Sequence, residues 1–123
     1  MKEYRLNLYN VERTLPFIPI GDDEAFASFV ILGDTELVGA CAPELAEKIG
    51  KVDAIVTAEA KGIALAYEVS RLLGKKEFIV ARKSEKSYMI DPVSVSVHSI
   101  TTKGEQHLYL DGTDATKIRG KKV

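Results

Sequence analysis

Residues 53–81 read DAIVTAEAKGIALAYEVSRLLGKKEFIVA, and their pattern determines which kind of sheet the chain builds. Residues 53–57 are a short apolar run, which indicates a buried strand. Residues 62–73 carry apolar side chains at helical spacing, and Gly74 is a typical helix stop. Residues 77–81 form a second short apolar run. A strand, a helix and a strand within about thirty residues predict a right-handed βαβ unit with two parallel strands.

The sequence before this unit predicts one more strand and one more helix. Residues 25–32 (AFASFVIL) are apolar and rich in β-branched and aromatic types, as strands are. Asp34 is placed to cap a helix that begins near Thr35. The apolar positions of that helix recur every four residues, at Leu37, Cys41, Leu45 and Ile49. Pro43 predicts a kink or a restart, and Gly50 predicts the end of the helix.

The sequence after the unit predicts a hairpin. Residues 93–98 alternate valine with serine and histidine, which indicates a half-buried strand. Gly104 lies in the turn that follows, and Leu108 and Leu110 belong to the returning strand. Residues 114–118 form one helical turn. Residues 111–114 (DGTD) are acidic but lack the further oxygen ligands of a calcium loop, so we interpret them as a turn.

Composition excludes several classes of protein. Of 123 residues, 46% are hydrophobic and 28% charged, which is typical of a folded domain and not of a disordered chain. Seventeen Lys and Arg against 18 Asp and Glu give a net charge of −1, so we expect no nucleic-acid partner. No apolar run approaches the roughly 20 residues of a membrane span, so we expect no membrane partner.

Cysteine usage and the N-terminal residues predict a cytoplasmic location. The N-terminus lacks the apolar segment of a signal peptide, and a single cysteine allows no internal disulfide. Cys41 lies among small apolar residues, so we interpret it as a core side chain. His98 and His107 are expected to face solvent. One cysteine and two histidines without ligand spacing predict no metal site held by protein residues.

Two loops follow the predicted parallel strands, and ligands of open parallel sheets bind at such strand ends. The first contains Glu59, Ala60, Lys61 and Gly62, which offer backbone N–H groups, a small-residue path and a lysine to a phosphate group. The same residues also fit an ordinary connection between strand and helix.

The second loop is strongly basic. Residues 75–86 hold five basic and two acidic residues, a local charge of +3. Arg82, Lys83 and Lys86 directly follow the strand end, where Arg can hold phosphate oxygens in a fork and Lys supplies a point charge. A solvated charged loop is the alternative. Two cationic loops at neighbouring strand ends favour an anion site, and the polar stretch that continues through Ser87 and Tyr88 predicts a flexible lid loop.

These residues resemble the type I phosphoribosyltransferases, most of all the adenine branch and also the xanthine branch. Residues 55–63 (IVTAEAKGI) are similar to that family's strand, E-A-(basic or small)-G loop and helix, and residues 81–86 (ARKSEK) to its strand ending in R-K-x-x-K. Residues 95–101 (VSVHSIT) are similar to a strand of the xanthine enzymes. Residues 13–26 loosely resemble the purine-covering hood, and residues 110–123 resemble the lead-in to the family's diphosphate-sugar motif.

The resemblance implies a fold class. It is an α/β, parallel-sheet, Rossmann-like phosphoribosyltransferase core with an N-terminal hood, incomplete at the C-terminus. Residues 1–123 are then a single truncated domain, with residues 1–34 as the hood arm and residues 35–123 as a partial core. The family's acidic pair followed by a Thr-Gly phosphate loop is absent from these residues, and the resemblance places its start a few residues after Val123. We therefore expect the 123-residue chain to be inactive.

The resemblance also implies a reaction and a site. Such enzymes transfer ribose 5-phosphate from phosphoribosyl pyrophosphate (PRPP) to a purine nitrogen, with Mg²⁺ as cofactor and pyrophosphate as leaving group. PRPP and a purine base are then the partners, and the chain is expected to form a homodimer. Phe26 of the hood is the candidate contact to the base, and no catalytic residue is assigned. The pyrophosphate-binding residues carried over from the family are Glu59, Ala60, Lys61, Gly62, Arg82, Lys83 and Lys86.

Two other functions remain open. One is a non-catalytic module of the same fold that senses a purine or PRPP. The other is an α/β fragment that forms oligomers without a ligand. The identity of the base, purine or pyrimidine, is also open.

Overall fold

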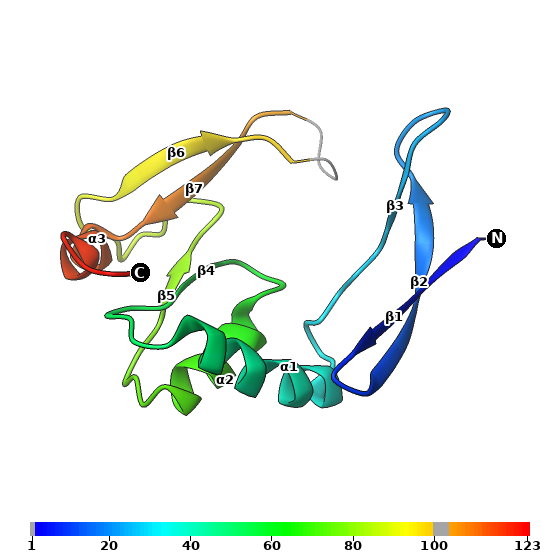
Figure 1. The fold of residues 1–123 in the computed structure, drawn as a ribbon. Helices are drawn as coiled ribbons and strands as arrows, with labels where there is room; N and C mark the ends of the chain where they lie inside the picture. Colours follow the sequence, from blue (N-terminus) through cyan, green and yellow to red (C-terminus); the bar gives the residue numbers. More distant parts are fainter. Residues whose placement is uncertain (1, 100–103) are drawn as a thin grey trace.

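The computed structural model describes residues 2–99 and 104–123. Figure 1 shows the N-terminal sheet and the β6–β7 hairpin at opposite ends, with the two long helices and the parallel strand pair between them. No helix among the described residues is long and apolar enough to cross a membrane. The elements are β1 (Glu3–Leu8), β2 (Val11–Pro19), β3 (Ala25–Ala27), α1 (Thr35–Ile49), β4 (Val56–Ala58), α2 (Ile63–Leu72), β5 (Ile79–Ala81), β6 (Val93–Val97), β7 (Gln106–Leu110) and α3 (Gly112–Ile118).

The predicted N-terminal arm is an antiparallel sheet of order β1-β2-β3. Tyr9 and Asn10 connect β1 to β2 with φ angles of 50° and 67°, the left-handed conformation that two-residue hairpin turns require. The strand predicted over residues 25–32 is confirmed only for Ala25–Ala27. The Ser28 N–H still donates to the Pro16 carbonyl of β2 at 2.9 Å, and the chain then leaves the sheet, so that Ile31 packs in the core at 8% exposure. Reaching the core therefore prevails over strand propensity in this segment.

Helix α1 begins where the sequence predicts. The Asp34 carboxylate accepts the Leu37 backbone N–H at 3.1 Å and so caps the helix. Gly50 ends it with a φ of 66°, a conformation that favours glycine. The predicted restart at Pro43 is wrong, because α1 continues through it. Pro43 has no N–H for the Gly39 carbonyl, but both residues are exposed, so water can satisfy that carbonyl.

The core joins the N-terminal sheet to both helices. Leu37 is 1% exposed and packs with Ile31, Val38 and Cys41. The residues that pack against this cluster from other elements are Leu8, Val11, Ala64 and Leu65. Cys41 is a core side chain as predicted, and burial raises the pKa of its thiol.

The βαβ unit is confirmed. Strands β4 and β5 pair in parallel, with Val56 opposite Ile79 and Ala58 opposite Ala81, and α2 connects them. Both strands are shorter than the predicted runs. Gly74 follows the helix with a φ of 71°, as expected of a residue that stops a helix.

The predicted hairpin is also confirmed, with Val93 opposite Leu110 in an antiparallel ladder. An antiparallel bridge between Arg82 and Tyr109 connects β7 to the end of β5. The prediction of a half-buried valine face is wrong: Val93 and Val95 are 49% and 58% exposed, because the described residues do not cover that face. The family-like stretch of residues 95–101 ends with two positions that lie outside the described residues.

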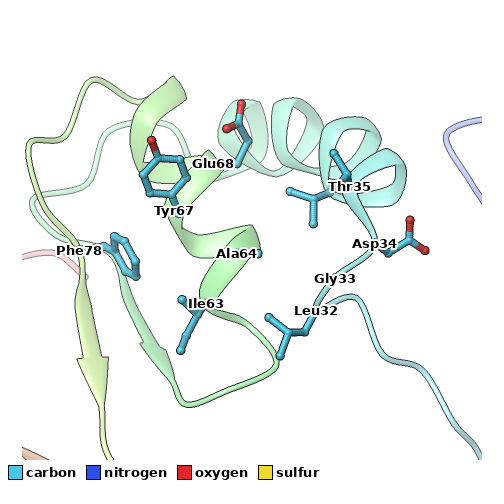
Figure 2. Close-up of a pocket in the computed structure, with 10 residues that line it drawn as sticks. Leu32, Gly33, Asp34, Thr35, Ile63, Ala64, Tyr67, Glu68 and Phe78 are labelled. Carbon is cyan, nitrogen blue, oxygen red and sulfur yellow. The ribbon is translucent and has the colours of Figure 1, made fainter.

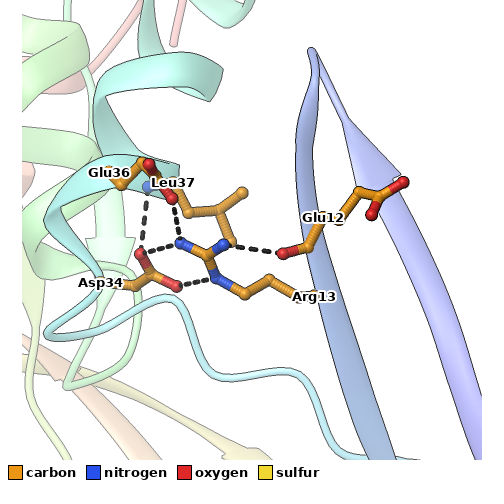
Figure 3. Close-up of polar contacts among 5 residues, drawn as sticks. All are labelled: Glu12, Arg13, Asp34, Glu36 and Leu37. Carbon is orange, nitrogen blue, oxygen red and sulfur yellow. Dashed lines mark hydrogen bonds and ion pairs between the residues drawn. The ribbon is translucent and has the colours of Figure 1, made fainter.

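An ion-pair cluster connects the N-terminal sheet to the start of α1 (Figure 3). Arg13 of β2 donates from Nε to Asp34 Oδ2 at 2.7 Å and from Nη2 to Asp34 Oδ1 at 2.9 Å. The same Nη2 donates to Glu36 at 2.8 Å, and Nη1 donates to the Glu12 carbonyl at 2.7 Å. The Arg13 hydrogen bonds lower the pKa of Asp34 to about 2. One carboxylate therefore caps α1 and holds β2 at the same time.

A core substitution should lower the free energy of unfolding far more than a substitution on the exposed valine face. We expect Leu37→Ala to lower the free energy of unfolding by about 2–5 kcal/mol, because it leaves a cavity at a fully buried position. Val95→Thr should change it by less than about 0.5 kcal/mol, because the side chain is exposed. Urea unfolding measures both values. Equal losses would show that the valine face is buried in solution.

The Asp34 cluster should make stability depend on acid. The pKa of the Asp34 carboxyl is lowered from 3.8 to about 2. The contribution of Asp34 to the free energy of unfolding is therefore complete above about pH 4 and is lost as the pH falls toward 2. Asp34→Asn should therefore lower stability at neutral pH and remove this part of the acid dependence. Urea midpoints measured across that pH range test it, with the exposed Asp22→Asn as control. Parallel acid profiles for Asp34→Asn and the unaltered chain would contradict it.

Candidate functional site

The parallel pairing of β4 and β5 places their carboxyl ends at one edge of the sheet. Ala58 is opposite Ala81, and the Glu59 N–H donates to the Ala81 carbonyl at 2.9 Å, which extends the pairing beyond the strands. The loop of residues 58–62 and the loop of residues 82–88 therefore begin side by side. The two predicted cationic loops share one edge, as the sequence indicates.

The first loop leads directly into α2. The peptide bond between Glu59 and Ala60 is cis. The Ile63 N–H donates to the Ala60 carbonyl at 3.2 Å, and no side chain caps the helix at Gly62. Lys61 is exposed, and its ammonium forms no hydrogen bond or ion pair with the described residues. It is thus available to an anion at this edge.

Gly62 is required by a close approach. A Cβ added to it would lie 2.5 Å from Thr57 Oγ1, closer than real side chains come. The sequence identifies Gly62 only as part of a small-residue path. Its packing against the end of β4 is a separate reason for glycine at this position.

The second loop is tied to the first through one carboxylate. Glu59 Oε1 accepts the Lys83 backbone N–H at 2.6 Å and Arg82 Nε at 3.2 Å. Arg82 Nη1 donates to the Tyr88 hydroxyl at 2.8 Å, and Lys86 Nζ donates to Ser84 at 2.8 Å.

These contacts set the charges of the site. The Lys83 N–H, followed by the Arg82 guanidinium, holds the pKa of Glu59 below its ordinary value. The hydrogen bond to Glu59 raises the pKa of Arg82. Both groups are charged at neutral pH and largely balance each other. The excess positive charge at this edge comes from Lys61, Lys83 and Lys86.

The structure brings together the seven residues predicted for pyrophosphate, and Ser87 and Tyr88 continue the second loop. Phe26 lies in β3, outside this network, and its contact with a base stays a prediction. Sequence reasoning missed Tyr109, whose N–H and carbonyl both pair with Arg82 at 2.8 and 2.9 Å. The sequence did predict a strand containing Leu108 and Leu110, which places Tyr109 in a strand, but it did not indicate that this strand pairs with Arg82.

An apolar cavity of about 450 Å³ lies between the start of α1 and α2, beside the first loop (Figure 2). Tyr67 and Phe78 form an edge-to-face pair at its wall, with ring centroids 6.4 Å apart. Ile63 and Ala64, which directly follow Gly62, also line it. Such a cavity suits an apolar or flat aromatic group. Its other lining residues are Leu32, Gly33, Asp34, Thr35, Val38 and Glu68.

A substitution pair tests the close approach at Gly62. Gly62→Ala should be destabilising, because its Cβ meets Thr57 Oγ1 at 2.5 Å. Adding Thr57→Ala should restore most of the loss, whereas Thr57→Val keeps a branched side chain of the same shape and should not. Thermal unfolding of the single and double variants gives the comparison. Equal stability of the two double variants would contradict the proposed clash.

Comparisons with known proteins support the fold. No protein-family model matches this chain, and no curated protein matches its sequence. Among solved structures, adenine phosphoribosyltransferase from Thermoanaerobacter pseudethanolicus matches with a TM-score of 0.59 and 22% identity over 78% of this chain. The match spans 56% of that enzyme's chain, so this protein corresponds to little more than half of its length. The chain therefore shares its α/β fold with this adenine phosphoribosyltransferase over most of its length.

Proposed function

We propose that this chain is the pyrophosphate-binding part of a purine phosphoribosyltransferase that acts in nucleotide salvage. One observation carries the proposal: two loops that present Lys61, Lys83 and Lys86 at the ends of adjacent parallel strands are joined by Glu59. The fold shared with an adenine phosphoribosyltransferase supports it. PRPP and a purine base are the proposed substrates, and a cytoplasmic homodimer is the proposed form.

The residues of the two loops would act on the leaving group. Transfer of ribose 5-phosphate to a purine nitrogen breaks the bond from C1 of the ribose to pyrophosphate, and negative charge grows on the departing oxygen. Fixed cations near that oxygen stabilise the transition state more than the substrate. Lys61, Lys83 and Lys86 are the cations whose charge is not balanced by Glu59. Their role is electrostatic, and none is assigned a proton transfer.

The Mg²⁺ ion of the family does not fit a protein-held site in this chain. Within residues 2–99 and 104–123, no three His, Cys, Asp or Glu side chains lie together in a way that could hold a metal ion. In the proposal, Mg²⁺ arrives with PRPP, bound by the oxygens of its diphosphate. No step of the chemistry is assigned to residues of this chain through the metal.

Transfer would also need groups that grip the ribose and its 5-phosphate. The family's acidic pair and Thr-Gly loop do not follow Leu110 in these 123 residues. We therefore expect this chain to bind pyrophosphate and PRPP without turnover. Phe26 remains the proposed contact to the base.

Calorimetric titration tests the anion site. The unaltered chain should bind pyrophosphate and PRPP in the presence of Mg²⁺, and Lys61→Gln should weaken both by about ten-fold, the loss typical of a charge-assisted contact. Lys51→Gln is the matched control, because this exposed lysine precedes β4 and so lies away from its carboxyl end. Equal losses in the two variants, or no binding by the unaltered chain, would contradict the proposal.

A turnover measurement distinguishes a phosphoribosyltransferase from a non-catalytic module that senses a purine or PRPP. The measurement is nucleotide formation from PRPP with adenine, hypoxanthine, guanine or xanthine. Turnover by the 123 residues alone would overturn the expectation of binding without transfer. If a chain that also carries the acidic pair and Thr-Gly loop binds both ligands without forming nucleotide, the non-catalytic sensing module becomes the better assignment.

A further inference from the structure

We propose that Glu59 is a positioning residue that holds the second cationic loop in place for an anionic diphosphate ligand. The inference rests on the proposed function for the identity of the ligand. Glu59 carries a negative charge into a site for anions, so a direct contact of its carboxylate with the diphosphate oxygens is unfavourable. Its value to the site must come from the groups that it fixes.

Glu59 holds the end of β5 with both its backbone and its side chain. Its N–H donates to the Ala81 carbonyl at 2.9 Å, and its carboxylate accepts the Lys83 N–H at 2.6 Å. Residues 81–83 are therefore bound at two points by one residue of the neighbouring loop. The short bond to a charged acceptor is of the strong class of hydrogen bonds.

Arg82 is fixed from several directions. Its backbone pairs with Tyr109 through both its N–H and its carbonyl, while its side chain donates from Nε to Glu59 and from Nη1 to the Tyr88 hydroxyl. Among the described residues, Nη2 makes no hydrogen bond. The Arg82 guanidinium is thus held through Nε and Nη1, and its Nη2 donors remain available to an anion. Tyr88 and Tyr109 extend this support to the rest of the second loop and to the hairpin.

The side-chain exposures agree with a positioning role. Glu59 is 21% exposed and Arg82 32% exposed, so the pair is partly shielded from solvent. Glu85, three residues after Arg82, is an exposed acid on the same loop without such contacts. Glu59 and Glu85 thus lower the positive potential of the loop in the same sense, but only Glu59 holds other groups.

This difference gives a test in which a pure charge effect and a positioning role predict opposite changes in the affinity for pyrophosphate. Glu59→Gln and Glu85→Gln each remove one negative charge next to a cationic site. Electrostatic attraction alone predicts that both variants bind pyrophosphate more tightly. The positioning role predicts that Glu59→Gln weakens binding by about ten-fold, because the neutral amide oxygen of glutamine accepts the Lys83 N–H and Arg82 Nε more weakly than the carboxylate does. Glu85→Gln should leave binding unchanged or strengthen it.

Arg82→Lys gives a second readout with the charge retained. Lysine cannot donate to Glu59 and Tyr88 with the geometry of a guanidinium, so binding should again weaken. The loss of binding in the double variant Glu59→Gln/Arg82→Lys should then be smaller than the sum of the two single losses, because the two residues share one contact. Circular dichroism and thermal unfolding establish that each variant is folded.

The outcomes distinguish this inference from the proposed function. Tighter pyrophosphate binding by Glu59→Gln, or additive losses in the double variant, would overturn the positioning role. If the unaltered chain binds no pyrophosphate, the proposed function fails, and hydrogen exchange of the Lys83 amide then decides about Glu59. Faster exchange in Glu59→Gln than in Glu85→Gln would support its hold on the loop, and equal exchange would overturn it.

Discussion

The parallel pairing of β4 with β5 is the constraint on which the site depends. Parallel strands end at the same edge, so the residues that follow Ala58 and Ala81 must begin as neighbours. A hairpin connection would place the two loops at opposite edges. The helix α2 makes the parallel arrangement possible, because it carries the chain back across the sheet. All seven cationic, acidic and small residues of the two loops owe their proximity to this crossover.

The sequence predicts this part of the fold well because its signals are local. Short apolar runs, a helical period and a glycine stop each refer to a few consecutive residues, and the cap at Asp34 likewise depends on its own helix. The N-terminal hairpin carries weaker signals. Its β2 strand contains Pro16 and Pro19, which normally argue against a strand. They are tolerated because each pairs with the first residue of a neighbouring strand, Glu3 or Ala25.

What the sequence could not show are contacts between distant segments. The spacing of the two loops indicates an anion site, but the hydrogen bonds from Arg82 and Lys83 to Glu59 depend on how two strand ends approach each other. Sequence reasoning placed Glu59 among the pyrophosphate-binding residues of its own loop and gave it no contact with the second loop. The Arg13 cluster was likewise beyond sequence reasoning, because the carboxylates of Asp34 and Glu36 lie more than twenty positions from Arg13. The valine alternation of β6 correctly predicts a strand, yet burial depends on what covers a face, and the period does not contain that information.

The buried thiol of Cys41 has a practical consequence. It lies in the cluster where α1, α2 and the N-terminal hairpin meet, at 6% exposure, and burial raises its pKa. The Cys41 thiolate is the form that attacks a disulfide reagent, whose S–S bond breaks and releases the other half as a thiolate. The folded core slows this reaction in two ways, because it keeps the thiol protonated and hides the sulfur from the reagent. Its rate of chemical labelling therefore reports how often the core opens. Since the sequence has no other cysteine, the protein carries its own site-specific probe of core dynamics.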